Sequence, residues 1–189
     1  MSTQAPGQPG PACARSVVLV GMMGAGKTAV GGVLARILRL PFRDSDAEIV
    51  AAAQMEITEI FERFGEPFFR DRETAVLARL LEGPPMVLAT GGGAFLSAHN
   101  REIVAAHGVS VWLKVDAATL WARVRSRPTR PLLMTEDPRA TLEALAAARA
   151  PVYGLADLTV EATPGASVTE MAERVAGAMS AHARRGDEA

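Results

Sequence analysis

The stretch that decides the fold is GMMGAGKT, which runs from Gly21 to Thr28. It matches the pattern of a phosphate-binding (Walker A) loop, in which glycines turn the backbone so that successive N–H groups point inward. Lys27 supplies a positive charge for the phosphates, and Thr28 supplies a hydroxyl suited to Mg²⁺. The simpler alternative is a glycine-rich turn that happens to contain Gly-Lys-Thr.

The sequence on either side of the loop favours phosphate binding. Residues 16–20 form a short apolar run, which is typical of a buried strand in a parallel sheet. After the loop, apolar residues recur at helical spacing, at Val30, Val33, Leu34, Ile37 and Leu38. The loop therefore leads from a buried strand into the N-terminus of a helix, where the helix dipole favours a bound phosphate.

Apolar strand candidates alternate with helical patterns along the rest of the chain. The candidates are residues 16–20, 42–44, 86–89, 109–115 and 158–160. This alternation predicts an α/β fold with a parallel sheet that carries helices on both faces. Capping boxes are predicted for Ser45 with Glu48 and for Ser167 with Glu170, and helix starts at Asp116 and Asp137.

Length and composition indicate one domain. The chain has 189 residues, of which 49% are hydrophobic, so it can bury one core, predicted here over residues 15–182. We expect residues 1–14 and 183–189 to be disordered tails.

Charge and hydropathy limit the classes of partner. A net charge of −1 argues against nucleic-acid and anionic-membrane partners, which call for a basic excess. No apolar stretch approaches the roughly 20 residues that span a bilayer. The single cysteine, Cys13, cannot form an internal disulfide, which is consistent with a reducing compartment. We expect a cytoplasmic monomer.

A pair of acids follows the second strand candidate. Asp44 ends that strand and Asp46 lies two residues on, so in an extended chain both carboxylates point to the same side. One such carboxylate can organise Mg²⁺, and the other can accept a hydrogen bond from an attacking hydroxyl. The alternatives are an ordinary loop acid at Asp44 and, at Asp46, an interaction with the helix dipole of ~0.3–1 kcal/mol. Because Ser45 suffices as the helix cap, we favour a functional role for Asp46.

Arg70 and Glu73 form a second polar pair. They follow a helix end predicted at Gly65, and their i, i+3 spacing on the next helix allows contact. Taken alone, this is a surface ion pair worth about 0–1 kcal/mol. If Arg70 faces a cleft, a guanidinium held by Glu73 could bind a substrate carboxylate through two hydrogen bonds. The sequence does not show which way the side chain of Arg70 faces.

Two further segments suit ligand binding. Gly91, Gly92 and Gly93 directly follow a strand candidate, where open α/β sheets bind ligands, although a flexible turn is the alternative. The arginine-rich segment 123–138 contains Pro128 and Pro131, so it cannot be helical throughout. It is either a solvated charged surface or a mobile lid that brings Arg130 over the phosphates.

In their order and spacing these stretches resemble the shikimate kinase family. The residues that carry the resemblance are GMMGAGKT, DSD, FRDRE, GGG, RPLL and RAPVY, spread over residues 16 to about 180. The resemblance implies a three-layer P-loop kinase fold with a parallel five-stranded sheet and a mobile lid at about 123–137. It also implies Mg²⁺-dependent transfer of the γ-phosphate of ATP to the 3-hydroxyl of shikimate, a step of aromatic amino-acid biosynthesis.

The same resemblance implies a role for each matching residue. Lys27, Asp46 and Arg130 would be catalytic, and Thr28 with Asp44 would hold the metal. The nucleotide would be bound by Gly24, Ala25, Gly26, Lys27, Thr28, Ala29, Arg123 and Arg130, with Arg123 against adenine. Shikimate would be bound by Asp46, Arg70, Gly91, Gly92, Gly93 and Arg149, with Glu73 positioning Arg70.

Two other readings stay open. Another small-molecule P-loop kinase, such as a gluconate kinase, would share the loop but need not carry both the Arg70–Glu73 pair and the triple glycine. A non-catalytic nucleotide-binding module would keep the loop but could lose the acid pair and the lid arginine.

Overall fold

Strand β1 (Ser16–Val20) lies in the middle of the sheet, which explains its apolar sequence. In this computed structural model, which describes residues 15–125, 133, 135–163 and 165–187, residues Val17 to Val20 are fully buried. They pair in parallel with β3 (Val87–Ala89) on one side and β4 (Gly108–Lys114) on the other. With β2 (Phe42–Asp44) and β5 (Leu158–Glu161) outermost, the strand order among the described residues is β2-β3-β1-β4-β5. The predicted five-stranded parallel sheet is confirmed, and the bounds of its strands differ from those predicted by at most one residue.

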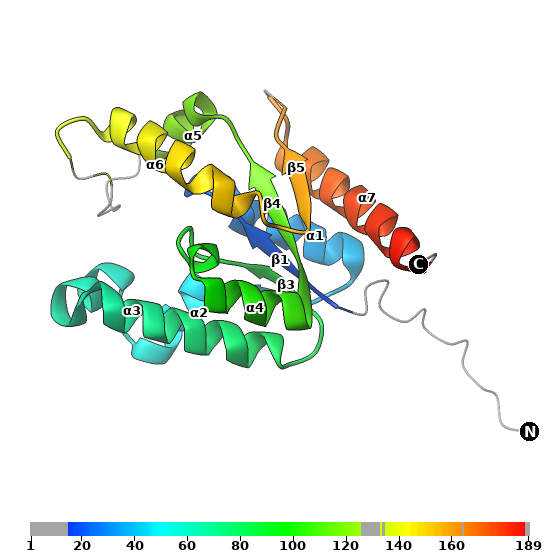
Figure 1. Cartoon of the computed structure of the whole chain (residues 1–189), viewed down its shortest axis with the longest axis horizontal. Coiled ribbons are helices and arrows are strands. Elements are labelled where there is room, and N and C mark those ends of the chain that lie inside the picture. The colour runs from blue at the N-terminus through cyan, green and yellow to red at the C-terminus, as the bar shows by residue number, and fades with distance from the viewer. Residues whose placement is uncertain (1–14, 126–132, 134, 164, 188–189) are drawn as a thin grey trace, which may run out of the picture.

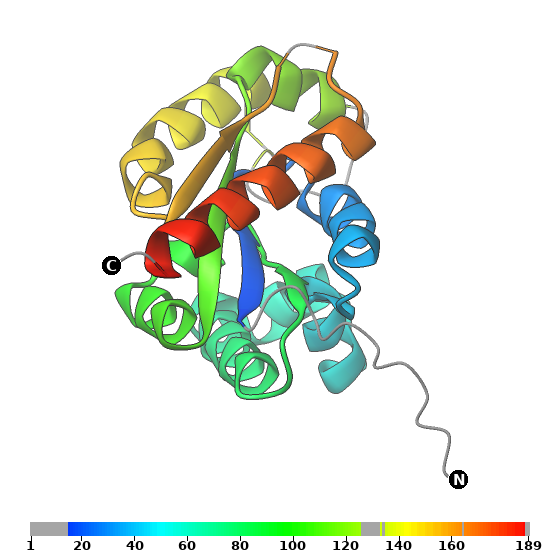
Figure 2. The same ribbon diagram turned by 90° about the vertical axis from the view of Figure 1, so that its right-hand side faces the viewer.

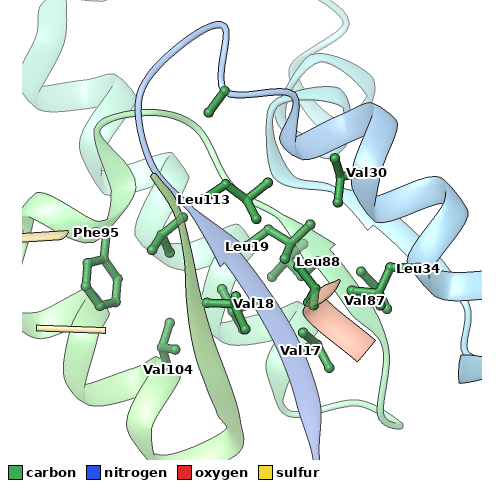
Figure 3. Packing of buried hydrophobic residues seen from close by; sticks show 14 of the residues in the cluster. Val17, Val18, Leu19, Val30, Leu34, Val87, Leu88, Phe95, Val104 and Leu113 are labelled. Atoms are coloured by element: carbon green, nitrogen blue, oxygen red, sulfur yellow. The ribbon is translucent and has the colours of Figure 1, made fainter. Parts of the chain in front are cut away.

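Helices cover both faces of this sheet (Figure 1). Helices α1 and α7 pack against each other, α4 contacts β4, and α6 lies beside α5. Figure 3 shows Val30 and Leu34 of α1 on one side of β1, and Phe95 and Val104 on the other. The helices are α1 (Lys27–Leu38), α2 (Ser45–Ala53), α3 (Ile57–Leu81), η1 (Ala94–Leu96), α4 (Ala98–His107), α5 (Ala117–Val124), α6 (Pro138–Tyr153) and α7 (Val168–Asp187).

The sheet topology brings three loops to one edge. Strand β1 leads into the phosphate-binding loop, β2 ends at Asp44, and β3 leads to Gly91. Because β2, β3 and β1 are adjacent and parallel, their carboxyl ends lie together, as in other open α/β sheets that bind ligands there. Segments far apart in the sequence are thus placed in one region by backbone pairing alone.

One predicted helix cap is wrong. Asp44 rather than Ser45 caps α2, because Asp44 Oδ1 accepts hydrogen bonds from the N–H groups of Asp46 and Ala47. Ser45 is already the first residue of the helix, and its hydroxyl accepts from the N–H of Gly91 instead. The caps predicted at Asp116, Asp137 and Ser167 are present.

The helix stop predicted at Gly65 is present: the backbone of Gly65 (φ 80°, ψ 173°) is not helical and divides α3 into two helical parts, so Arg70 lies on the second part as predicted. One helix end differs from expectation. Helix α7 continues to Asp187, past the predicted end of ordered chain at residue 182. Alanine and arginine in this last part are good helix formers, and Arg184 and Arg185 favour the negative end of the helix dipole. Figure 2 shows α7 reaching the edge of the molecule at this end. The predicted N-terminal tail lies outside the described residues.

No helix in the described part of the chain is both long and apolar enough to cross a membrane.

Candidate active site

The phosphate-binding loop adopts the conformation that its glycines allow. Gly24 (φ 82°) and Gly26 (φ 93°) occupy the left-handed region, which strains other residues. Lys27 begins α1 and is almost fully buried, and its ammonium group donates to the carbonyls of Gly21 (2.7 Å) and Met22 (3.0 Å). The lysine side chain thus lies against the loop, and Lys27 lines the space that the loop surrounds.

That space is a cavity of about 790 Å³. All of the predicted nucleotide-binding residues from Gly24 to Ala29 line it, together with Asp44, Asp46, Gly92 and Arg123. Five residues that line this cavity were not predicted to do so: Ala162, Ala166 and Ser167, which lie between β5 and α7, and Val168 and Met171 on α7. Ser167 was predicted only as a helix cap, and the other four are apolar side chains without a chemical signature for nucleotide binding.

Thr28 and Asp44 form the candidate metal site. The Thr28 hydroxyl donates to Asp44 Oδ2 at 2.7 Å, at the edge of the loop cavity. A hydroxyl and a carboxylate oxygen are the hard donors that Mg²⁺ prefers, and the ion usually completes its shell with waters and substrate phosphates. These two residues therefore fit Mg²⁺, although the described residues contain no group of three or more His, Cys, Asp or Glu that could hold a metal by themselves.

Asp46 lines the same cavity, but not for the predicted reason. The chain is not extended at this point, because α2 begins at Ser45 and places Asp46 in its first turn. Its Oδ1 atom lies 2.7 Å from the position that a Cβ atom would take at Gly91. The carboxylate is therefore packed against the glycine run, beside the phosphate-binding loop.

Arg70 is held by two glutamates. Its Nη1 donates to Glu73 at 2.8 Å, as the spacing predicted, and its Nε and Nη2 donate to Glu66 at 3.2 and 2.9 Å. Burial alone would lower the pKa of Arg70, but the contacts with Glu73 and then Glu66 outweigh it and raise that pKa. The contact with Glu66 was not predicted, although its i, i+4 spacing was a readable signal.

Glu73 is the most buried acid of the site, with a side chain only 1% exposed. Burial raises its pKa, the hydrogen bond and charge of Arg70 oppose that rise, and the nearby charge of Asp46 adds to it. Its Oε1 lies 2.8 Å from the Cβ position of Gly91, close to the place where Asp46 also approaches. Two carboxylates therefore meet at one glycine.

A second cavity has a volume of about 630 Å³. Arg70, Gly93 and Arg149 line it, so the two arginines predicted to bind the same carboxylate face one space. Gly92 lines the first cavity and its neighbour Gly93 lines the second, so both cavities border the glycine run. Gly91 lines neither cavity, and its N–H donates to Ser45.

Tyr153 connects the helix that carries Arg149 to this centre. Its buried hydroxyl donates to the carbonyl of Gly92 and also contacts Met22 Sδ at 3.8 Å. Burial raises the pKa of Tyr153, and the charge of Arg149 opposes that rise. This tyrosine belongs to the stretch RAPVY, which contributes to the family resemblance, but no role was predicted for it.

The two predicted lid arginines have different outcomes. Arg123 lies at the end of α5, and its Nη1 donates to the carbonyls of Gly24 (3.2 Å) and Ala25 (3.4 Å), so it lies against the phosphate-binding loop. Arg130 and most of the predicted lid lie outside the described residues.

A parallel sheet, a phosphate-binding loop and a nearby cavity that two arginines line define a P-loop kinase of small molecules. The family profile described as shikimate kinase matches residues 23–180. A shikimate kinase of Ruegeria pomeroyi is 61% identical over 88% of this chain and 85% of that protein. The solved structure of Acinetobacter baumannii shikimate kinase in complex with shikimate superposes with a TM-score of 0.85, at 38% identity, over 89% of this chain and 94% of that one.

The chain belongs to the shikimate kinase family and is an enzyme of that kind. A gluconokinase from Sinorhizobium meliloti is also similar in structure, with a TM-score of 0.56 over 91% of this chain and 95% of that one. Its identity to this chain is only 16%, so the likeness shows a shared fold alone.

Proposed function

We propose that the chain transfers the γ-phosphoryl group of ATP to the 3-hydroxyl of shikimate, with Mg²⁺ bound at Thr28 and Asp44. The observation that carries the proposal is the adjacency of two cavities. One is lined by the phosphate-binding loop and Asp46, and the other by Arg70 and Arg149. A carboxylate bound by two guanidiniums would anchor one end of the substrate and leave its hydroxyls facing Asp46.

In the proposed reaction the protein positions groups and stabilises charge. The substrate oxygen forms a bond to the γ-phosphorus as the bond to the leaving oxygen of ADP breaks. Asp46 orients the attacking hydroxyl and accepts its proton, while the ammonium of Lys27 moves from the carbonyls of Gly21 and Met22 to the phosphates. Bound Mg²⁺ would offset phosphate charge. Glu73 keeps the Arg70 guanidinium in place.

The proposal is tested by ADP release after mixing the purified protein with ATP and Mg²⁺ and one candidate acceptor. Shikimate, gluconate, a nucleoside monophosphate and no acceptor are compared. Release that depends on shikimate alone supports the proposal. Release with gluconate or the nucleotide would overturn the substrate, and no release with any acceptor would favour a binding module.

The Lys27→Ala variant should lose both turnover and ATP binding. We expect kcat to fall by roughly 10²–10³-fold, because the lysine charge acts on the phosphates in the transition state as well as in the ground state. Steady-state kinetics with varied ATP measures both constants. The matched control is Lys114→Ala, since Lys114 is the chain's other lysine and pairs with Glu161 on the sheet edge. Equal losses in both variants would contradict the assignment of Lys27.

A further inference from the structure

The guanidinium of Arg70 has little room for another anion. Its Nε and Nη2 groups both donate to Oε1 of Glu66, and Nη1 donates to Glu73. The Nη1–Nη2 end lies against Gly93, where an added Cβ atom would be 2.6 Å from Nη2 and closer still to Nη1. Each edge of the guanidinium is therefore occupied or covered.

A carboxylate binds arginine most strongly through two parallel hydrogen bonds to one edge. At Arg70 the backbone of Gly93 covers the edge formed by Nη1 and Nη2, and the buried Glu73 holds Nη1. Only the edge formed by Nε and Nη2 is therefore occupied by a group that can leave. Glu66 uses that edge with a single oxygen at 3.2 and 2.9 Å. It thus stands where a substrate carboxylate would bind.

The two glutamates differ in their freedom to leave. The side chain of Glu73 is 1% exposed, so moving it away from Arg70 would leave a buried charge without its partner. The side chain of Glu66 is 59% exposed and can turn into water. It also follows the break at Gly65 and precedes Pro67, so it lies at the start of the second part of α3.

We propose that Glu66 is an internal competitor that holds the carboxylate-binding edge of Arg70 until shikimate displaces it. This inference rests on the proposed function, since it takes Arg70 as the residue that binds the substrate carboxylate. In the empty enzyme, Glu66 neutralises and orients the guanidinium. On binding, one carboxylate replaces another on the same edge, so Glu66 lowers the affinity for shikimate and rejects ligands that cannot outcompete it.

The test is the Kd of shikimate for the full-length protein, measured by titration calorimetry on wild type and the Glu66→Gln and Glu66→Ala variants. We expect the Kd to fall by roughly three- to tenfold in Glu66→Gln, because an exposed ion pair no longer competes. Glu66→Ala should tighten binding at least as much, since it also removes the amide oxygen. Shikimate methyl ester, which has no charged carboxylate, should bind wild type and both variants equally.

The matched control is Asp71→Asn. Asp71 is an exposed acid that lines the same cavity, so this variant changes the local charge equally without freeing the edge of Arg70. An equal tightening in Asp71→Asn, or an equal tightening for the methyl ester, would overturn the proposal in favour of a general charge effect. Unchanged or weaker shikimate binding in the Glu66 variants would also overturn it.

An Arg70→Ala variant separates this inference from the function on which it rests. If Arg70→Ala weakens shikimate binding but the Glu66 variants do not strengthen it, only the competitor role of Glu66 fails. If Arg70→Ala leaves shikimate binding unchanged, the carboxylate role of Arg70 in the proposed function fails as well.

Discussion

Replacing Asp46 with asparagine should reduce kcat by roughly 10²–10⁴-fold while leaving the KM for ATP within about threefold of wild type. The carboxylate lines the cavity of the phosphate-binding loop and lies against Gly91, and in the proposed reaction it accepts the proton of the attacking hydroxyl. Asparagine keeps the size of the side chain but cannot accept the hydroxyl proton. The loss should therefore fall on turnover, as measured by steady-state kinetics with saturating shikimate.

Glu48→Gln is the matched control for this variant. Both acids lie in the first turn of α2, where a negative charge favours the helix dipole by ~0.3–1 kcal/mol. Glu48 pairs instead with Arg79 and Arg43 and does not line the loop cavity. If the two variants lose similar stability and neither loses turnover, Asp46 serves the helix alone and its catalytic role is wrong.

Local sequence patterns predicted the fold well because backbone pairing and burial decide it. The apolar run of β1 is typical of a strand covered on both faces, and the glycines of the loop allow the turn that follows it. The prediction that Ser45 caps α2 was wrong because Asp44 and Ser45 are both good N-cap residues. Only the tertiary structure decides between them, since it gives the Ser45 hydroxyl to the N–H of Gly91.

Site residues could be predicted where the residue type itself indicates the chemistry. They could not be predicted where the role depends on which way the side chain faces. Arg70 and Glu73 could be paired from their spacing, and the family resemblance implied that Arg70 and Arg149 bind one carboxylate. It is the fold that places Arg70 in one cavity with Arg149, 79 positions later in the sequence. The role of Tyr153 could not be predicted either, because its hydrogen bond to the carbonyl of Gly92 joins two segments that are far apart in the sequence. The role of each site residue stays a prediction until the variants are measured.

Gly91→Ala should cost at least about 10²-fold in kcat/KM for shikimate, although Gly91 itself lines neither cavity. The new Cβ would lie 2.7 Å from Asp46 Oδ1 and 2.8 Å from Glu73 Oε1, closer than carbon and oxygen approach. Glu73 is buried against Arg70, so its side chain cannot turn into solvent. The clash therefore displaces Asp46, Glu73 or both. Overpacking of this kind also destabilises a core by roughly 1–3 kcal/mol.

Gly92→Ala separates this effect from the other reason for a glycine run, the close approach of a substrate to the backbone. At Gly92 the nearest contact that an added Cβ would make with the described part of the chain is 3.4 Å, to the amide nitrogen of Met23. Kinetics and denaturant unfolding are measured on both variants. If Gly91→Ala alone is impaired, the first glycine is there to give the two carboxylates room. If Gly92→Ala is equally impaired but folds normally, the glycines instead serve a ligand that passes over the run. If Gly91→Ala keeps full activity and stability, the carboxylates are not held where the structure places them.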